Sequence, residues 1–420
     1  MEASLSKALE KLLDRADRTM RGAAPLLDTI TWSRDVEERF FDRGGGALPE
    51  PNYEVDRAQL EEKLRALDAL EADLPKGEPI GRFLARRIES LRLGARMILA
   101  IGTPEFGRLS ARAFGGARSS WLDDDTDNLH FAEHLAERIG VDSASVATEK
   151  ETMSAAEFRG SLIARLEARS VKTVLEVLLD DSLSAKVIAG KKRVRVRPDA
   201  RFTVEEARSL YLHEVETHVF TAQNGDLQPV HVLDAGGPLA TRTQEGLAVF
   251  AEMYAKALTL PRLARLIERV RLVARAEDGA DFLEVFRYLT GRGVSPRTAF
   301  VDASRIFRGG VLTGGSAFTK DASYLGGFAE VYNVLRVAIR ANQRVFAEVL
   351  VSGRLALDEM PDLLALREEG LLVPPRFVPS WLRSWDDLVV HFAFSSFLQE
   401  IDLCAIERRY PWLSRLVGAS

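Results

Sequence analysis

The stretch from Tyr211 to Gly225, YLHEVETHVFTAQNG, places His213 and His218 on either side of Glu214. A second glutamate, Glu245, follows within QEGLA, residues 244–248. Catalytic zinc sites combine three imidazole or carboxylate ligands with one position left for water. The residue types therefore predict that His213, His218 and Glu245 hold zinc. Glu214 is predicted to take the proton of the water and pass it to the leaving amine.

The spacing of the two histidines sets a condition on the backbone. His213 and His218 are five residues apart, which on a regular α-helix would separate their directions by about 140°. A π-helical turn between Leu212 and Val219 would bring them onto one face, and we predict such a turn. The alternative is an accidental motif in which the two histidines are buried and hydrogen-bonded.

Two predicted helices contain the three ligands. A capping box, Thr203 to Glu206, starts an active-site helix over 204–223, which Asn224-Gly225 should end in a left-handed stop. The motif Thr241 to Gln244 should cap a third-ligand helix over 242–258, with Glu245 in its first turn.

Short β-rich runs over 173–197 predict a small sheet before the active-site helix. The run from Arg193 to Arg197 alternates arginine and valine, so one face of that strand is all arginine. This pattern favours a solvated edge strand. A second interpretation is a rail for an extended acidic peptide.

The remainder of the chain has helical periodicity. We expect a helical lobe over 1–150 and a catalytic domain over 151–420, whose last part, 261–420, is again helical. The fold class is α+β, predominantly helical, with a zincin-like core in which the sheet lies beside the active-site helix. His130 and His134 share a predicted helix face, and an exposed surface is the simpler interpretation than a second metal site.

Composition narrows the class of protein. The net charge of −5 and the pI near 5.9 argue against a nucleic-acid or anionic-membrane partner. A single cysteine, Cys404, excludes an intrachain disulfide and a cysteine-based metal site. The N-terminus has no apolar signal core and no apolar run is long enough to span a bilayer, so we expect a cytoplasmic protein.

The motifs HEVETH and QEGLA together resemble the microtubule-associated tyrosine carboxypeptidases and their bacterial QEGLA-motif relatives. The resemblance runs from about Thr173 to Phe397 and includes the stretches 305–310 and 318–321. It implies zinc bound by His213, His218 and Glu245, with Glu214 as catalytic base. It also implies removal of a C-terminal residue from a peptide or protein, whose identity and acidity the sequence leaves open.

A carboxypeptidase must also recognise a free carboxylate. Arg305, Arg308 and Lys320 flank the glycine-rich loop 309–315, and we expect these basic residues to bind the substrate together with Tyr324. The same arginines could instead pair with neighbouring carboxylates. For the oxyanion, the candidate donors are His231, Tyr254 and Tyr324, whereas His391 is most simply a core residue.

The rival hypothesis is a helical regulatory or scaffold protein whose metal is structural or absent. A fourth protein ligand, such as Glu216 or His231, would favour it, because catalysis needs an open coordination position.

Overall fold

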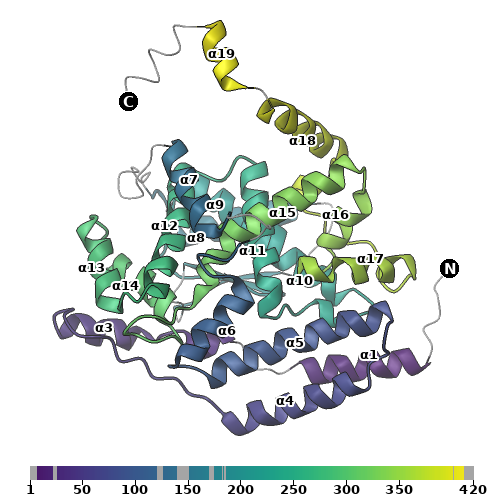
Figure 1. Ribbon diagram of the computed structural model, residues 1–420, viewed down its shortest axis with the longest axis horizontal. Coiled ribbons are helices and arrows are strands. Elements are labelled where there is room, and N and C mark those ends of the chain that lie inside the picture. Colours follow the sequence, from purple (N-terminus) through teal and green to yellow (C-terminus); the bar gives the residue numbers. More distant parts are fainter. Residues whose placement is uncertain are drawn as a thin grey trace.

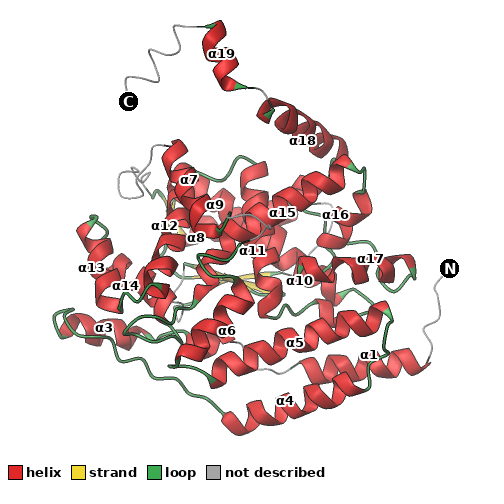
Figure 2. Cartoon of the chain, viewed as in Figure 1, coloured by secondary structure: helices red, strands yellow, loops and turns green. Residues whose placement is uncertain are grey.

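The computed structural model describes residues 7–21, 26–120, 126–139, 151–169, 175–181, 183, 186–400 and 402–410. Helices make up most of this part of the chain, and the strands are few and short (Figure 2). This confirms the predicted α+β, predominantly helical class. The predicted boundary between a lobe over 1–150 and a domain over 151–420 lies at the end of a segment outside the described ranges, 140–150, and it stays a prediction.

Three long helices lie side by side in the N-terminal region (Figure 1). These are α1 (Lys7–Met20), α4 (Arg57–Ala72) and α5 (Pro79–Leu99). The other helices of this region are α2 (Leu26–Ile30), α3 (Arg34–Asp42), α6 (Pro104–Phe114) and α7 (Asn128–Ile139). Leu67 and Phe83 belong to the same hydrophobic cluster as Leu212 and Phe250 of the predicted ligand helices. The N-terminal helices therefore share a core with the candidate site.

The strands form two small sheets. In the first, β1 (Met153–Ser154) pairs antiparallel with β5 (Arg201–Phe202). The second has the order β2 (Glu176–Leu179), β4 (Arg193–Val196), β3 (Val187–Ala189), with β2 parallel and β3 antiparallel to β4. Helix α8 (Ala155–Glu167), with its capping box, packs against β2.

The arginine-rich strand β4 is therefore central, and the predicted edge position is wrong. Its alternation instead separates two faces, because Val194 and Val196 are fully buried while Arg193 is exposed. Arg195 on the outer face forms a 3.2 Å ion pair with Asp180.

The predicted active-site helix is one continuous element. It consists of α9 (Val204–Leu210), the π-helix η1 (Tyr211–Val219) and α10 (Phe220–Asp226). The Thr203 hydroxyl accepts from the Glu206 amide at 3.0 Å, as a cap should. The stop predicted at Gly225 is wrong, because Gly225 lies inside α10. A Cβ there would lie 2.2 Å from the carbonyl oxygen of Leu233, so the glycine allows the backbone at Leu233 to pack closely against α10.

The third-ligand helix is α11 (Thr241–Tyr254). It follows the 3₁₀ turns η2 (His231–Leu233) and η3 (Pro238–Ala240) and crosses α15 (Ser323–Arg340). The helix starts one residue earlier than predicted and ends four residues earlier, and Glu245 lies in its second turn. The cap predicted from Thr241 to Gln244 is absent, because Thr241 is already the first residue of the helix and the N-cap residue, Ala240, makes no side-chain cap hydrogen bond. The Thr243 hydroxyl accepts from the Leu357 amide at 3.0 Å.

Two glycines make the crossing of α11 and α15 close. A Cβ on Gly246 would lie 2.1 Å from the carbonyl carbon of Gly327, and a Cβ on Gly327 would lie 2.0 Å from the Arg242 carbonyl oxygen. Only glycine fits at both positions. The glycine of QEGLA thus sets how closely α11 packs on α15, and with it the position of the adjacent Glu245.

The C-terminal region is helical, as predicted. Its elements are α12 (Leu260–Glu277), α13 (Phe282–Gly291), α14 (Pro296–Phe307), η4 (Thr319–Ala322), α16 (Arg344–Leu350), η5 (Leu357–Glu359), α17 (Met360–Glu368), η6 (Ser380–Leu382), α18 (Trp385–Gln399) and α19 (Leu403–Arg409). Helix α18 packs against α15, and α19 follows it at the edge of the molecule (Figure 1). Within the described ranges, every helix is too short or too polar to cross a bilayer.

Candidate metal centre

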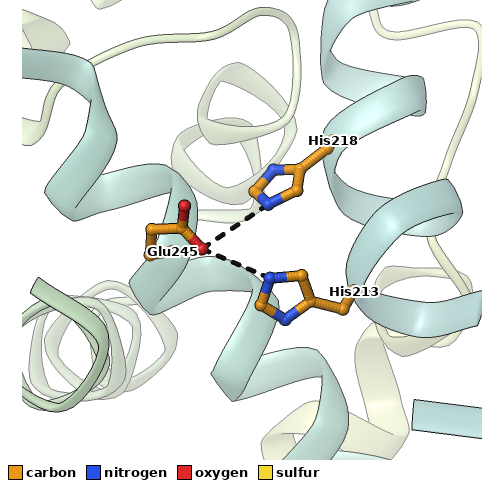
Figure 3. Close-up of side chains that lie close together, drawn as sticks. All are labelled: His213, His218 and Glu245. Atoms are coloured by element: carbon orange, nitrogen blue, oxygen red, sulfur yellow. Dashed lines mark hydrogen bonds and ion pairs between the residues drawn. The ribbon is translucent and has the colours of Figure 1, made fainter. Parts of the chain in front are cut away.

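The π-helix brings the two histidines together, which confirms the predicted turn. The rings of His213 and His218 lie 4.9 Å apart at 84° and face α11 from the same side of the helix (Figure 3). The Thr217 hydroxyl donates to the Leu212 carbonyl, five residues earlier, at 3.0 Å. This bond adds a side-chain link across the wide turn.

Glu245 on α11 completes the group. Its Oε2 lies 3.2 Å from Nε2 of His213 and 3.6 Å from Nε2 of His218 (Figure 3). Two ligands of a tetrahedral zinc ion, each about 2.0–2.1 Å from the metal, are themselves about 3.3 Å apart. The two distances match that edge length. Among the described residues, this is the one group of three His, Cys, Asp or Glu side chains with ligand atoms this close together.

A buried carboxylate orients the first histidine. Glu252, two turns beyond Glu245 on α11, is fully buried, and its Oε1 lies 2.7 Å from Nδ1 of His213. Ser209 and Arg262 also donate to Glu252. A carboxylate on the outer nitrogen of a metal-binding histidine fixes the ring and its tautomer. Nε2 of His213 is thus presented to the side of Glu245.

The charges around His213 act strongly on its protonation. Burial lowers the pKa of His213, but the hydrogen bonds to Glu245 and Glu252 raise it to about 10. Burial raises the pKa of Glu252, and Arg262 and His213 bring it down to about 2. Without a cation in the centre, the carboxylates therefore favour a protonated His213. A divalent ion would replace that proton.

Lys320 bonds to the second carboxylate oxygen of Glu245 and to Tyr324. Nζ of Lys320 donates to Oε1 of Glu245 at 2.6 Å and to the Tyr324 hydroxyl at 3.3 Å. Burial raises the pKa of Glu245, and Lys320 followed by His213 holds it well below its usual range. One carboxylate oxygen is thus occupied by Lys320, while the other points at the histidines.

Glu214 lies beside the group and faces open space. It is half-buried and lines a pocket of about 750 Å³ together with His213, Glu252 and Tyr324. Within the described part of the chain, no side chain hydrogen-bonds or ion-pairs with the Glu214 carboxylate. A carboxylate free of protein partners at a pocket wall can exchange a proton with a molecule in that pocket.

Neither candidate for a fourth protein ligand joins the group. Glu216 is buried and accepts from Arg169 and from the amide and hydroxyl of Ser380, at 2.7 and 2.6 Å. His231 is exposed on η2. Both of them lie outside the cluster.

The predicted substrate-binding residues divide into two sets. Arg305 and Tyr324 line the pocket beside His213, and Arg305 forms a two-point ion pair with Asp321 at 2.6 and 2.8 Å. Arg308 is not among the pocket residues. Its guanidinium lies over Phe318 at 5.1 Å, and burial followed by Arg305 lowers its pKa to about 10.

The glycine-rich loop is occupied by the protein itself. Gly309 donates its amide to the Tyr53 hydroxyl at 2.9 Å, and Gly315 donates to the Ala276 carbonyl at 2.9 Å. The amides of Gly310, Val311 and Gly314 also bond to backbone oxygens. An anion in this loop would have to displace these bonds.

The remaining predicted residues lie apart from the cluster. Tyr254 packs on Phe250 and on the ring of His391 at 5.1 Å, and His391 is half-buried. His130 and His134 are exposed on α7, as the simpler interpretation had it.

Four residues at the site escaped prediction. Glu252 follows Glu245 by seven residues, a spacing that places both on one face of a helix. Arg262, Arg265 and Arg269 line the pocket from α12, again at helical spacing. The spacings were visible in the sequence, but the packing of α12 against η4 and α15 was not.

Comparison with known proteins gives one family. The family model described as microtubule-associated tyrosine carboxypeptidase matches residues 38–400. This confirms the resemblance drawn from HEVETH and QEGLA. A search of curated proteins gave no significant match.

Proposed function

Because the chain belongs to the microtubule-associated tyrosine carboxypeptidase family, which implies a carboxypeptidase-type activity, we propose that it is a zinc metallocarboxypeptidase. It would remove a C-terminal residue from a peptide or protein. The zinc ligands would be His213, His218 and Glu245, and Glu214 would be the catalytic base.

The convergence of three ligand atoms beside a partner-free Glu214 is the observation that supports this proposal most. The donor set of two imidazoles and one carboxylate is that of hydrolytic zinc sites. A zinc ion held there would act as a Lewis acid on the peptide carbonyl and would acidify a water molecule.

The side chains of the chain then have separate tasks. Glu214 takes a proton from the attacking water and delivers it to the departing amine. Overall, one water molecule is added across the cleaved peptide bond. Glu252 holds His213 in one orientation through Nδ1. Lys320 neutralises one oxygen of Glu245 and keeps that carboxylate ionised.

The position of the small sheet supports a zincin-like core. Strand β3 packs against the π-helix that contains both histidines. We propose that the sheet supports one side of the substrate cleft, as in zincins. Arg305 and Tyr324, which line the pocket, remain proposed substrate contacts. Arg308 and Lys320 do not line it, and they contact Phe318 and Glu245 instead. An acidic C-terminus remains a candidate substrate.

Two measurements test the proposal. Elemental analysis of the purified chain should give about one zinc per molecule, and His218→Ala should remove it. Peptides with free C-termini should lose their last residue, while the same peptides amidated should stay intact. A bound metal without cleavage of any peptide would instead favour a structural site.

A further inference from the structure

The pocket beside Glu214 has a wall of arginines on α12. Arg262, Arg265 and Arg269 follow one another at intervals of three and four residues, so their side chains share one face of the helix. His213 and Glu214 line the same pocket. A molecule in this pocket would therefore touch the candidate catalytic centre and the arginines together.

Two of the arginines in the pocket have strong carboxylate partners. Arg262 contacts both oxygens of Glu252 at 3.3 Å, and Arg305 contacts both oxygens of Asp321. Burial lowers the pKa of Arg262 and of Arg305, but the carboxylate beside each raises it above its usual value. These two guanidiniums are satisfied by the protein.

The other two differ in this respect. Arg265 forms no hydrogen bond or ion pair within the described part of the chain, and Arg269 reaches Asp321 only at 3.7 Å. Burial, and then the neighbouring Arg262 or Arg305, lowers the pKa of each. Both guanidiniums therefore lack an adequate counter-charge, and an anion in the pocket would supply it.

The carboxylates nearest to these arginines are engaged elsewhere or weakened. Glu206, the acidic group that acts most on Arg265, accepts from Lys186 at 3.0 Å. Asp321 is paired with Arg305. Burial raises the pKa of Asp302, which weakens its value as a counter-ion.

Tyr324 connects Arg269 to the candidate metal centre. The guanidinium of Arg269 lies 5.2 Å from the centroid of the Tyr324 ring, and that ring stacks on His213 at 6.1 Å. Arg269 and His213 therefore lie beside the same ring, and all three residues line the pocket.

We propose that Arg265 and Arg269 hold the free C-terminal carboxylate of the substrate and so determine that cleavage occurs at the last peptide bond. This rests on the proposed function, and it assigns the carboxylate to α12 rather than to the glycine-rich loop. Arginine suits the task, because its planar fork binds a carboxylate through two parallel hydrogen bonds.

Arg265→Gln tests the proposal with the least risk to folding, because Arg265 has no partner to lose. The probes are twenty hexapeptides, each ending in a different amino acid, made as free acids and as amides. For free acids, kcat/KM should fall on the order of 10- to 100-fold, as expected for loss of a charged hydrogen bond. Arg265→Lys should recover part of this loss.

A matched control is Arg275→Gln, on the same helix but outside this pocket, which should leave kcat/KM unchanged. Unchanged kcat/KM for free acids in Arg265→Gln would overturn the proposal. So would an equal loss in Arg275→Gln, since that would report a general effect of charge.

A binding measurement separates this proposal from the proposed function. The Glu214→Gln variant and the Glu214→Gln, Arg265→Gln double variant are titrated with the same peptides. The preference for free acid over amide should be present in the first and largely lost in the second. If the wild type binds free acids selectively but cleaves none, the proposed activity is wrong, whereas the role of Arg265 and Arg269 in binding the C-terminal carboxylate is retained. If the wild type prefers free acids neither in binding nor in cleavage, the proposed carboxylate site at Arg265 and Arg269 is wrong.

Discussion

The Nδ1 atom of His213 lies 2.7 Å from Oε1 of Glu252, and both side chains are buried. The contact joins the helix of the two histidines to α11, which contains Glu245. It also leaves Nε2 of His213 as the nitrogen that faces Glu245.

Glu252→Gln should weaken zinc binding by about 10- to 100-fold, because an amide holds the imidazole less firmly and makes it a poorer donor. Competition with a chelator measures the affinity. Glu348→Gln on α16, which belongs neither to the cluster nor to the pocket lining, is the control. Equal zinc affinity of the Glu252 variant and the wild type would mean that this carboxylate does not act on the metal.

Glu214→Gln should keep its zinc and lose about 10²- to 10⁴-fold in kcat, since the amide cannot accept the proton of water. Metal content and peptide turnover are measured on the same sample. Glu205→Gln changes another carboxylate of the same pocket and should retain activity. Full activity in the Glu214 variant would exclude this residue as the base.

Gly246→Ala should destabilise the protein by about 1–3 kcal/mol or more, because the new Cβ would collide with the backbone of Gly327. Zinc affinity should fall as well, since Glu245 is adjacent. Urea denaturation measures the free energy of unfolding.

Gly160→Ala on α8 is the matched control for that change. No atom lies within 4 Å of the site of its Cβ, so this variant should gain up to about 1 kcal/mol of helix stability. If Gly246→Ala were equally well tolerated, the close crossing of α11 and α15 could not position Glu245.

Arg87→Met should cost about 3–5 kcal/mol, because it leaves Glu359 buried without its 2.9 Å ion-pair partner. Arg87 lies on α5 and Glu359 on η5, so the pair ties the N-terminal helices to the C-terminal region. Replacing both residues, as Arg87→Met with Glu359→Gln, should recover part of the loss. Breaking a surface ion pair, such as that of Arg344 and Glu348, should cost less than about 1 kcal/mol of stability.

The loss caused by Arg87→Met should also depend on pH. Burial raises the pKa of Glu359, and Arg87 opposes that shift. Without Arg87 the pKa of Glu359 in the folded state rises further above its value in the unfolded chain. Protonation of Glu359 therefore favours the folded state. The destabilisation should therefore be smaller at pH 5 than at pH 8 by urea denaturation, and a deficit independent of pH would contradict this account.

The sequence contained the local features of the candidate site. The spacing of five positions from His213 to His218 predicted a π-helix, and the capping residue Thr203 marked where the helix begins. These predictions depended on contacts within a few positions along the chain, where helix geometry alone decides the outcome.

Long-range contacts account for what the sequence did not reveal. Lys320 and Glu245 are 75 residues apart, and nothing local predicts that they pair. The position of β4 at the centre of its sheet also follows from pairing with β2 and β3, while its arginines suggested an edge. Gly225 likewise suggested a helix stop, because a close approach by Leu233 leaves no local signal.

The π-helix has a consequence for how such enzymes are recognised. The wide turn lets a histidine pair separated by one extra residue reach the same geometry as a pair four apart. A search limited to the shorter spacing would pass over this chain, although the ligand atoms of its two histidines and Glu245 lie within 4.8 Å of one another. A five-residue interval followed by Gln-Glu-Gly on a second helix is therefore worth treating as a metal-site pattern in its own right.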